Sequence, residues 1–381
     1  MRIIVFCGYY HPHKGGYCKN THELAKRLVA RGHSVDVVTC NTESSPPTEV
    51  IDGVQVIRLP VLVKMSEFPI PAPGGMLWSL FKRNYYDVAI TQSRIFLTTV
   101  LGDIYSLTKH IPLIHVERGG QHTVTRNPLF TWMMKVYDHT IGHAIIGDSF
   151  SVVAISEASC VFVVHLNNKT PTRIIYNGIN VPDLMVMLPP WLNDGGHRTD
   201  IVFAGRLIYG KGVQDLITAF ETINAKHKET FLRIIGDGPY RWTLEEQATH
   251  SPAADHINFL GEVAQEEIVE TIGDGHIFVN PSYSEGMPTS VLEAASVGMP
   301  IIATDVGGTR EIIRDGVTGY LVPPKRPVQI AETIELIMSD WRKAEAVGKL
   351  AREAAKQLDW SMITDQWEEL LEEAVSIKRK E

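Results

Sequence analysis

Short apolar runs alternate with amphipathic stretches along most of the chain. Residues 1–7 form an apolar run, a His- and Gly-rich loop follows, and the apolar spacing of residues 24–28 predicts a helix that ends at Gly32. The β-branched run 35–39 predicts the next strand. The same pattern predicts further strands at 54–59, 88–91, 113–116, 144–146, 151–154 and 173–176. Strands that alternate with helices predict a doubly wound parallel sheet for this half.

The second half repeats the pattern. Strands are predicted at 200–204, 231–235, 257–260, 276–280 and 301–304, with an amphipathic helix at 213–226. Pro and Gly cluster around 183–198, which predicts a linker, and the chain from residue 328 onward is predicted to be helical. We expect an N-terminal domain at 1–185, a second domain at 186–355, and a C-terminal helix at 356–381 that returns toward the first. Trp360 and Trp367 are expected to pack against a neighbouring element.

One segment, 60–81, interrupts the alternation with several prolines among apolar side chains. It is interpreted either as an exposed apolar flap or as a loop packed on its own domain, and we favour the packed loop.

Length and composition fit two soluble domains. The chain has 381 residues, ordinary apolar and charged fractions, and no apolar run near the roughly 18 residues that a membrane-spanning helix needs. The first apolar run is too short for a signal peptide, and the four cysteines lack metal or disulfide spacing. These features predict a cytoplasmic protein, with peripheral association at the inner face of the cell membrane as an open alternative.

The charge is unevenly distributed. Residues 1–185 hold 17 Lys/Arg and 13 Asp/Glu, whereas the remainder holds 19 and 31. A basic half indicates either an anionic partner or drift in surface composition, and both interpretations stay open. Because the basic residues are scattered, nucleic acid is not an expected partner.

Two carboxylates lie eight residues apart across a predicted helix start. Glu285 lies in the loop before Pro288, and Glu293 follows on the helix, which should end at Gly298. Free N–H groups at a helix start attract phosphate, and carboxylates suit sugar hydroxyls. The pattern therefore favours a nucleotide-sugar site. The alternative is an ordinary helix-dipole partner followed by a solvated glutamate.

At this point the chain resembles the retaining glycosyltransferases of family 4, also called glycosyl transferases group 1. The resemblance covers residues 1 to about 325, with the motifs in the family's order. They are Gly15-Gly16, Tyr176-Asn177-Gly178-Ile179-Asn180, Phe203-Ala204-Gly205-Arg206-Leu207 with Lys211-Gly212, Gly236-Asp237-Gly238-Pro239, Glu285 through Glu293, and Asp305-Val306-Gly307-Gly308. The resemblance implies the GT-B fold, two Rossmann-like domains facing a cleft.

The resemblance also implies roles for individual residues. Arg206 and Lys211 would hold the donor pyrophosphate, Glu293 the ribose hydroxyls, and Glu285 the transferred sugar. The remaining donor-binding residues would act largely through backbone; they are Gly15, Gly16, Gly205, Gly236, Gly286, Met287, Pro288 and Thr289, with Gly261, Glu262 and Val263 near the base.

The chain departs from the family at one position. Many relatives place a His just after the fourth strand of the first domain, where this chain has Arg118. Either Arg118 donates a hydrogen bond to the sugar in place of that His, or His122 moves in, and both stay open. His115 is interpreted as a core or edge-strand residue.

No metal or cofactor is expected. The sequence has no Asp-x-Asp, the usual Mg²⁺ or Mn²⁺ anchor of the other large glycosyltransferase architecture, and His11 and His13 lack an evident third ligand. The resemblance implies a metal-independent hexosyltransferase of glycan biosynthesis that moves a sugar, with retention, from a nucleoside-diphosphate sugar to a glycan, lipid-linked or small-molecule acceptor. The basic first half and the apolar segment 60–81 add the expectation of an anionic or lipid-linked acceptor and of peripheral membrane association.

Three alternatives remain at this level. A nucleotide-sugar epimerase would share the architecture, a phosphorylase would need a lysine for pyridoxal phosphate that the sequence does not reveal, and a silent subunit would bind donor without turnover. A dehydrogenase is excluded because no Gly-x-Gly-x-x-Gly follows the first strand.

Overall fold

The computed structural model describes residues 1–13, 15–65, 68–82, 86–123, 128–182, 198–264 and 267–378. They form two compact units: unit 1 comprises Met1–Asn177 and Trp360–Glu381, and unit 2 comprises Gly178–Asp359. The chain therefore passes between the units twice. The domain boundary predicted between residues 185 and 186 lies outside the described residues.

Unit 1 is built on an eight-stranded sheet in the order β10-β9-β8-β7-β1-β2-β4-β3. Its described strands pair in parallel except β3 with β4. The strands are β1 (Arg2–Phe6), β2 (Ser34–Cys40), β3 (Thr48–Ile51), β4 (Val54–Leu59), β7 (Val88–Gln92), β8 (Leu113–Glu117), β9 (Ser151–Ala154) and β10 (Thr172–Ile174). A separate hairpin joins β5 (Val61–Met65) to β6 (Phe68–Pro71).

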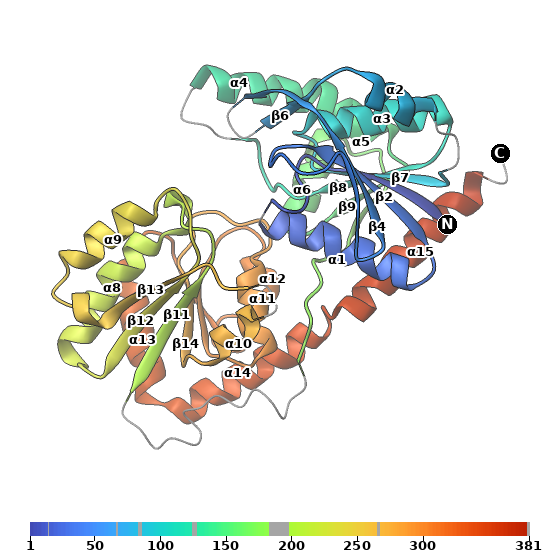
Figure 1. Cartoon of the computed structure of the whole chain (residues 1–381). Coiled ribbons are helices and arrows are strands. Elements are labelled where there is room, and N and C mark those ends of the chain that lie inside the picture. Colours follow the sequence, from blue (N-terminus) through green and yellow to red (C-terminus); the bar gives the residue numbers. More distant parts are fainter. Residues whose placement is uncertain are drawn as a thin grey trace. The chain divides into compact units, whose positions relative to one another are not determined.

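Helices cover both faces of this sheet (Figure 1). The helices of unit 1 are α1 (Gly16–Ala30), α2 (Gly75–Lys82), α3 (Leu97–Lys109), α4 (Pro128–Tyr137), the π-helix η1 (Asp138–Gly142), α5 (His143–Asp148), α6 (Glu157–Leu166) and α15 (Trp360–Lys378). Side chains of α2 and α3 form one core with the sheet, including Leu80 and Tyr105 against Phe6. On the other face α1 contacts α15, where Trp360 and Trp367 are buried.

Unit 2 has a six-stranded parallel sheet in the order β13-β12-β11-β14-β15-β16. The strands are β11 (Thr199–Ala204), β12 (Thr230–Ile235), β13 (Ile257–Gly261), β14 (Ile277–Asn280), β15 (Ile301–Thr304) and β16 (Tyr320–Val322). The helices are η3 (Tyr209–Lys211), α8 (Val213–Lys226), α9 (Arg241–Thr249), η4 (Ala254–His256), α10 (Ile268–Gly273), α11 (Thr289–Ser296), α12 (Thr309–Ile312), α13 (Pro327–Ser339) and α14 (Trp341–Lys356).

The strand order of unit 2 is that of a Rossmann fold, because the chain adds strands outward from β11 on one side and then from β14 on the other. Figure 1 shows α8, α9 and α13 on one face of this sheet and α10, α11 and α12 on the opposite face. Since both faces are covered, central strands such as β14 and β15 are buried at every residue. This explains the continuous apolar runs in the sequence.

Two predictions for unit 1 need correction. Residues 144–146 were predicted as a strand but belong to helix α5. Ile145 and Ile146 are buried side by side in that helix, and a short apolar run alone does not distinguish a buried helix from a strand. The described part of segment 60–81 is not a loop, because it contains β5, β6 and most of α2. Leu80 of α2 packs into the core, whereas Leu62 of β5 and Trp78 of α2 are exposed.

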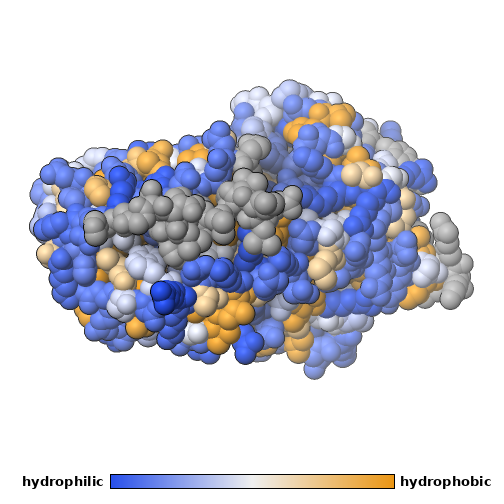
Figure 2. Space-filling view, turned by 90° about the horizontal axis from the view of Figure 1, so that it is seen from below, coloured by the Kyte–Doolittle hydropathy of each residue, from blue (hydrophilic) through white to orange (hydrophobic). Residues whose placement is uncertain are grey.

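The surface seen in Figure 2 is mainly hydrophilic, with separate smaller apolar patches. Every helix among the described residues is too short or too polar to span a bilayer. All four cysteines lie within the described residues, and none forms a disulfide.

Candidate active site

The carboxyl ends of β11 and β14 lie next to each other, at the point where the strand order of unit 2 reverses. Residues 205–212 follow β11 and residues 281–288 follow β14. The N–H of Tyr283 donates a hydrogen bond to the Gly210 carbonyl at 2.8 Å and so joins the two loops. Gly212 has φ 68°, and a Cβ there would lie 2.0 Å from the Pro281 carbonyl oxygen. Open α/β sheets bind their ligands at this crevice.

Lys211 and Glu285 form an ion pair at the crevice. Lys211 Nζ lies 2.6 Å from Glu285 Oε1, and the Glu285 side chain is only 8% exposed. The buried Ser282 hydroxyl donates to the same carboxylate oxygen at 2.6 Å. Two of the predicted site residues are thus in direct contact although 74 positions separate them.

A third loop supports the Glu285 backbone. Gly307 has φ 53°, and a Cβ at this position would lie 1.8 Å from the Glu285 carbonyl oxygen. The Gly308 N–H donates to the Gly286 carbonyl at 2.9 Å. The Asp305-Val306-Gly307-Gly308 motif therefore fixes the backbone that carries Glu285.

The other predicted residues after β11 and β12 lie on the same edge of the sheet. Arg206 is exposed on the loop that also carries Lys211. The Gly205 N–H donates to the Ile235 carbonyl at 3.0 Å, and the Gly236 N–H donates to the Gly261 carbonyl at 2.7 Å. These bonds hold the ends of three neighbouring strands together.

Helix α11 begins beside Glu285. Met287 and Pro288 are buried before its first residue, Thr289, which is half-buried. Glu293, which is predicted to bind the ribose, lies in the second turn of the helix and is also buried. Gly261 ends the edge strand β13, followed by an exposed Glu262 and a half-buried Val263; the last three were predicted near the base.

Sequence reasoning missed Ser282 and Tyr283. The Tyr283 hydroxyl donates to Asp215 Oδ2 at 2.9 Å and accepts from Gln214 Nε2 at 2.7 Å, which ties the β14 loop to the start of α8. Burial and the Asp215 carboxylate raise the pKa of Tyr283. The Ser-x-x-Glu spacing of Ser282 and Glu285 was the signal that could have identified the first of them.

In unit 1, Arg118 follows β8 and contacts neighbouring polar groups. Its Nε donates to Gln92 Oε1 at 3.0 Å and its guanidinium donates to Asn177 Oδ1 at 3.2 Å. The guanidinium also lies 5.3 Å from the centre of the Tyr17 ring. Burial lowers the pKa of Arg118, opposed by Tyr17 and nearby cysteines. A cavity of about 20 Å³ adjoins Arg118, enough for about one water.

His122 contacts a different group. Its Nδ1 lies 2.7 Å from Oδ2 of the fully buried Asp138. Asp138 in turn pairs with Arg94 through Nε and Oδ1 at 2.8 Å, and Arg94 also contacts Glu117 Oε2 at 2.8 Å. Arg118 and His122, the two alternatives for the family histidine, therefore have separate partners.

The buried network orients the loop after β8. Glu117 Oε1 accepts hydrogen bonds from the N–H groups of Arg118 and Gly119, at 2.9 and 2.7 Å. Burial alone would raise the pKa of Glu117, but Arg94 and His115 outweigh it and lower the pKa to about 2. His115 is buried within β8 and hydrogen-bonds Thr91, as expected of a core residue.

Gly15 and Gly16 lie at the start of α1, after β1. Both are exposed, and Gly15 has φ 151° with no heavy atom near the position of a Cβ. Among the described residues, no side chain caps the N-terminus of α1. The first backbone N–H groups of α1 therefore point out of the helix end, where a ligand can accept hydrogen bonds from them.

Comparison with known proteins identifies the class to which this fold belongs. The family model described as Glycosyltransferase Family 4 matches residues 15–182, and the model described as Glycosyl transferases group 1 matches residues 193–354. The fold is that of the GT-B glycosyltransferases. A solved sucrose-phosphate synthase from Thermosynechococcus elongatus matches 99% of this chain and 99% of its own, with a TM-score of 0.81 and 21% identity.

The chain belongs to the glycosyltransferases of family 4, also described as glycosyl transferases group 1, and is a glycosyltransferase enzyme. An uncharacterized glycosyltransferase of Methanocaldococcus jannaschii is 26% identical, covering 99% of both chains. The structure of HepE from Anabaena in complex with UDP-glucose matches 98% of this chain and 100% of its own, with a TM-score of 0.75 and 19% identity.

Proposed function

We propose that this chain transfers a hexosyl group from a nucleoside-diphosphate sugar to an acceptor hydroxyl, with retention and without a metal ion at the diphosphate. The observation that carries the proposal is the Lys211–Glu285 pair at the crevice between β11 and β14. It combines a cation for phosphate with a carboxylate for sugar hydroxyls, beside the start of α11. The UDP-glucose complex of HepE supports a donor of this class.

The cations would hold and stabilise the diphosphate. Lys211 has three N–H donors, one of which is used by Glu285, so phosphate oxygens can take the others. The exposed Arg206 on the same loop would add a planar pair of donors. Together they would neutralise the charge that develops on the leaving nucleoside diphosphate.

The two carboxylates would bind different sugars of the donor. The contacts of Glu285 with Lys211 and Ser282 both use Oε1, which leaves Oε2 suited to accept from a hydroxyl of the transferred sugar. Glu293, in the second turn of α11, would accept hydrogen bonds from the ribose hydroxyls.

The proposed reaction is a same-face substitution. The bond between the anomeric carbon and the β-phosphate oxygen breaks, and the acceptor oxygen bonds to that carbon on the same face. The acceptor proton passes to the departing phosphate oxygen, so no enzymic base is needed. Proton NMR of the first-formed product tests this step, because retention gives the anomeric configuration of the donor.

The acceptor is proposed to be lipid-linked or anionic and to be reached at a membrane surface. Leu129, Trp132, Met133 and Val136 are exposed on one face of α4, at the spacing of an amphipathic helix. The ring centroids of Phe68 in β6 and Phe130 in α4 lie 6.4 Å apart, so the apolar β5–β6 pair adjoins this helix. The excess of basic residues in the first half supports an anionic surface, such as the inner face of the cell membrane.

The site assignment is tested by two substitutions with different expected effects. Glu293→Ala should raise the KM and Kd for the donor at least tenfold, because ribose contacts are the same in ground and transition states. Arg206→Ala should mainly lower kcat, by about 10²-fold or more, because charge on the diphosphate grows in the transition state. The values of kcat and KM are measured by release of nucleoside diphosphate, and Kd is measured by donor titration.

Matched controls are available on the same unit. Glu332→Ala on α13 and Arg342→Ala on α14 remove exposed residues of the same types outside the proposed site and should leave kinetics unchanged. If Glu293→Ala and Arg206→Ala also keep wild-type kinetics, the site assignment is wrong. Donor binding without any turnover would support a silent subunit instead.

A further inference from the structure

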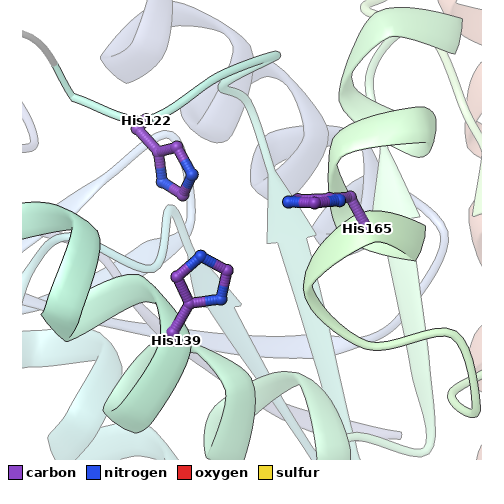
Figure 3. A group of neighbouring side chains, drawn as sticks. All are labelled: His122, His139 and His165. Carbon is purple, nitrogen blue, oxygen red and sulfur yellow. The ribbon is translucent and has the colours of Figure 1, made fainter.

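Three histidines from separate elements of unit 1 meet at the surface. His122 lies in the loop after β8, His139 in η1, and His165 near the end of α6. Each offers a ligand atom, and these atoms all lie within 4.8 Å of one another. Figure 3 shows the three rings directed toward a shared space. Their spacing in sequence matches no familiar metal motif, so only the fold brings them together.

One of the three rings is already oriented. A carboxylate can only accept, so the 2.7 Å contact between His122 Nδ1 and Asp138 Oδ2 places the ring proton on Nδ1. Nε2 of His122 then carries the lone pair that can bind a metal ion. Asp138 is held by Arg94, and the His122 ring packs nearly perpendicular to the Phe162 ring, with 5.1 Å between the ring centroids. Histidine ligands in metalloproteins are commonly fixed by a carboxylate in this way.

We propose that His122, His139 and His165 bind a divalent transition-metal ion, Zn²⁺ first among them. Imidazole nitrogen suits Zn²⁺, and three protein ligands leave a fourth position for water or an anion. Zn–N bonds of about 2.0–2.1 Å place tetrahedral ligands about 3.3 Å apart, so the rings must close from their present separation. His139 and His165 are exposed on helices, which allows this rotation.

The ion would cross-link the loop after β8 to two helices. Arg118 lies four residues before His122. At the start of this loop, Glu117 accepts hydrogen bonds from the N–H groups of Arg118 and Gly119. A metal ion at His122 would therefore anchor both ends of this short loop. The proposed metal site lies in unit 1 and does not depend on the proposed sugar transfer. That transfer was proposed to need no metal ion at the donor diphosphate, which is a different site.

Zinc titration of the full-length, tag-free protein tests the site without any sugar nucleotide. The protein is stripped with a chelator, exchanged into chelator-free buffer, and titrated with ZnCl₂ by calorimetry. We expect one Zn²⁺ per chain and a melting temperature that rises with Zn²⁺ concentration. Co²⁺ in place of Zn²⁺ should give the visible absorption of a tetrahedral nitrogen site.

Substitutions decide whether this cluster is the binding site. The double variant His139→Ala/His165→Ala should weaken Zn²⁺ binding at least 100-fold and abolish the Co²⁺ absorption. Both residues are exposed, so its metal-free melting temperature should match that of the wild type. His250→Ala, which removes an exposed histidine after α9, should bind like the wild type. Equal Zn²⁺ affinity of the double variant and the wild type, or no binding to the wild type, overturns the proposal.

Discussion

Glu285 depends on residues from three different loops. Lys211 and Ser282 hold its carboxylate, and Gly307 contacts its backbone from a third loop. Each partner comes from a different strand end of the same parallel sheet. The position of this one side chain therefore reports the correct register of β11, β14 and β15.

The Gly307→Ala substitution should disrupt this arrangement. A residue with φ near 50° costs about 1–2 kcal/mol when it carries a Cβ, and here the Cβ would also overlap the Glu285 carbonyl. We expect a loss of unfolding free energy well above that range, with lower donor affinity, measured by urea unfolding and donor titration.

Gly316→Ala provides the matched control for Gly307→Ala. Gly316 has φ 69° but no heavy atom within 4 Å of a Cβ, so it should show the backbone cost alone. An equal loss of stability in the two variants would mean that the contact with Glu285 does not constrain the loop.

Glu117 should contribute stability that depends on pH. Its pKa is lowered from 4.5 to about 2 in the folded protein, so the unfolded state binds its proton first on acidification. The contribution is full above about pH 4.5 and is lost as pH falls toward 2. Glu117→Gln should therefore destabilise strongly at pH 7, by about 3–5 kcal/mol, because it leaves Arg94 with one buried carboxylate fewer.

The measurement for Glu117 is urea unfolding of both proteins between pH 7 and pH 3. The difference between wild type and Glu117→Gln should shrink as the pH falls below 4.5. A difference that stays constant over this range would show that the Glu117 carboxylate is not specifically stabilised in the fold.

At the scale of elements, apolar periodicity predicted most strands and the long helix α8. It failed where the signal was short or of another kind. The β3–β4 hairpin was missed although Asp52 and Gly53, both with positive φ, form the Asp-Gly turn that marks such hairpins. Residues 144–146 were assigned to a strand because three apolar residues fit either period.

The candidate site was predictable as a set of motifs but not as a geometry. Loops after parallel strands gather at one edge, which placed Lys211 and Glu285 together in outline. Their direct ion pair depends on the register of two strands about 70 residues apart, which no local pattern encodes. The same holds for His122, whose partner Asp138 lies in a π-helix that has no sequence signature.

The exposed face of α4 predicts membrane binding. Trp132→Ser/Met133→Ser should reduce co-sedimentation with vesicles that contain anionic lipid several-fold, because it removes exposed apolar area that would enter the lipid interface. Val328→Ser/Leu336→Ser, on exposed positions of α13 in unit 2, is the control and should have no effect. No sedimentation of the wild type with either neutral or anionic vesicles would remove the membrane proposal.

At the scale of the whole molecule, two doubly wound units are built from one repeated pattern. The chain leaves unit 1 after Asn177 and returns to it at Trp360, so unit 1 is completed by the last helix. Trp360 and Trp367 of α15 are buried, and Arg27 of α1 lies over the Trp360 ring at 4.8 Å. The returning helix was expected from the sequence, whereas its partner residues on α1 were not.

The central claim is that unit 2 binds a nucleoside-diphosphate sugar at the crevice between β11 and β14. It is tested most directly by thermal unfolding with UDP, GDP, ADP and their common sugar conjugates, without added metal, for wild type and Glu293→Ala. A ligand that binds only the folded state raises the melting temperature, by about 5–10 °C at 100-fold excess over Kd. The account predicts such a shift with one nucleotide series, clearly smaller in Glu293→Ala. No shift of the wild-type protein with any of these ligands would contradict it.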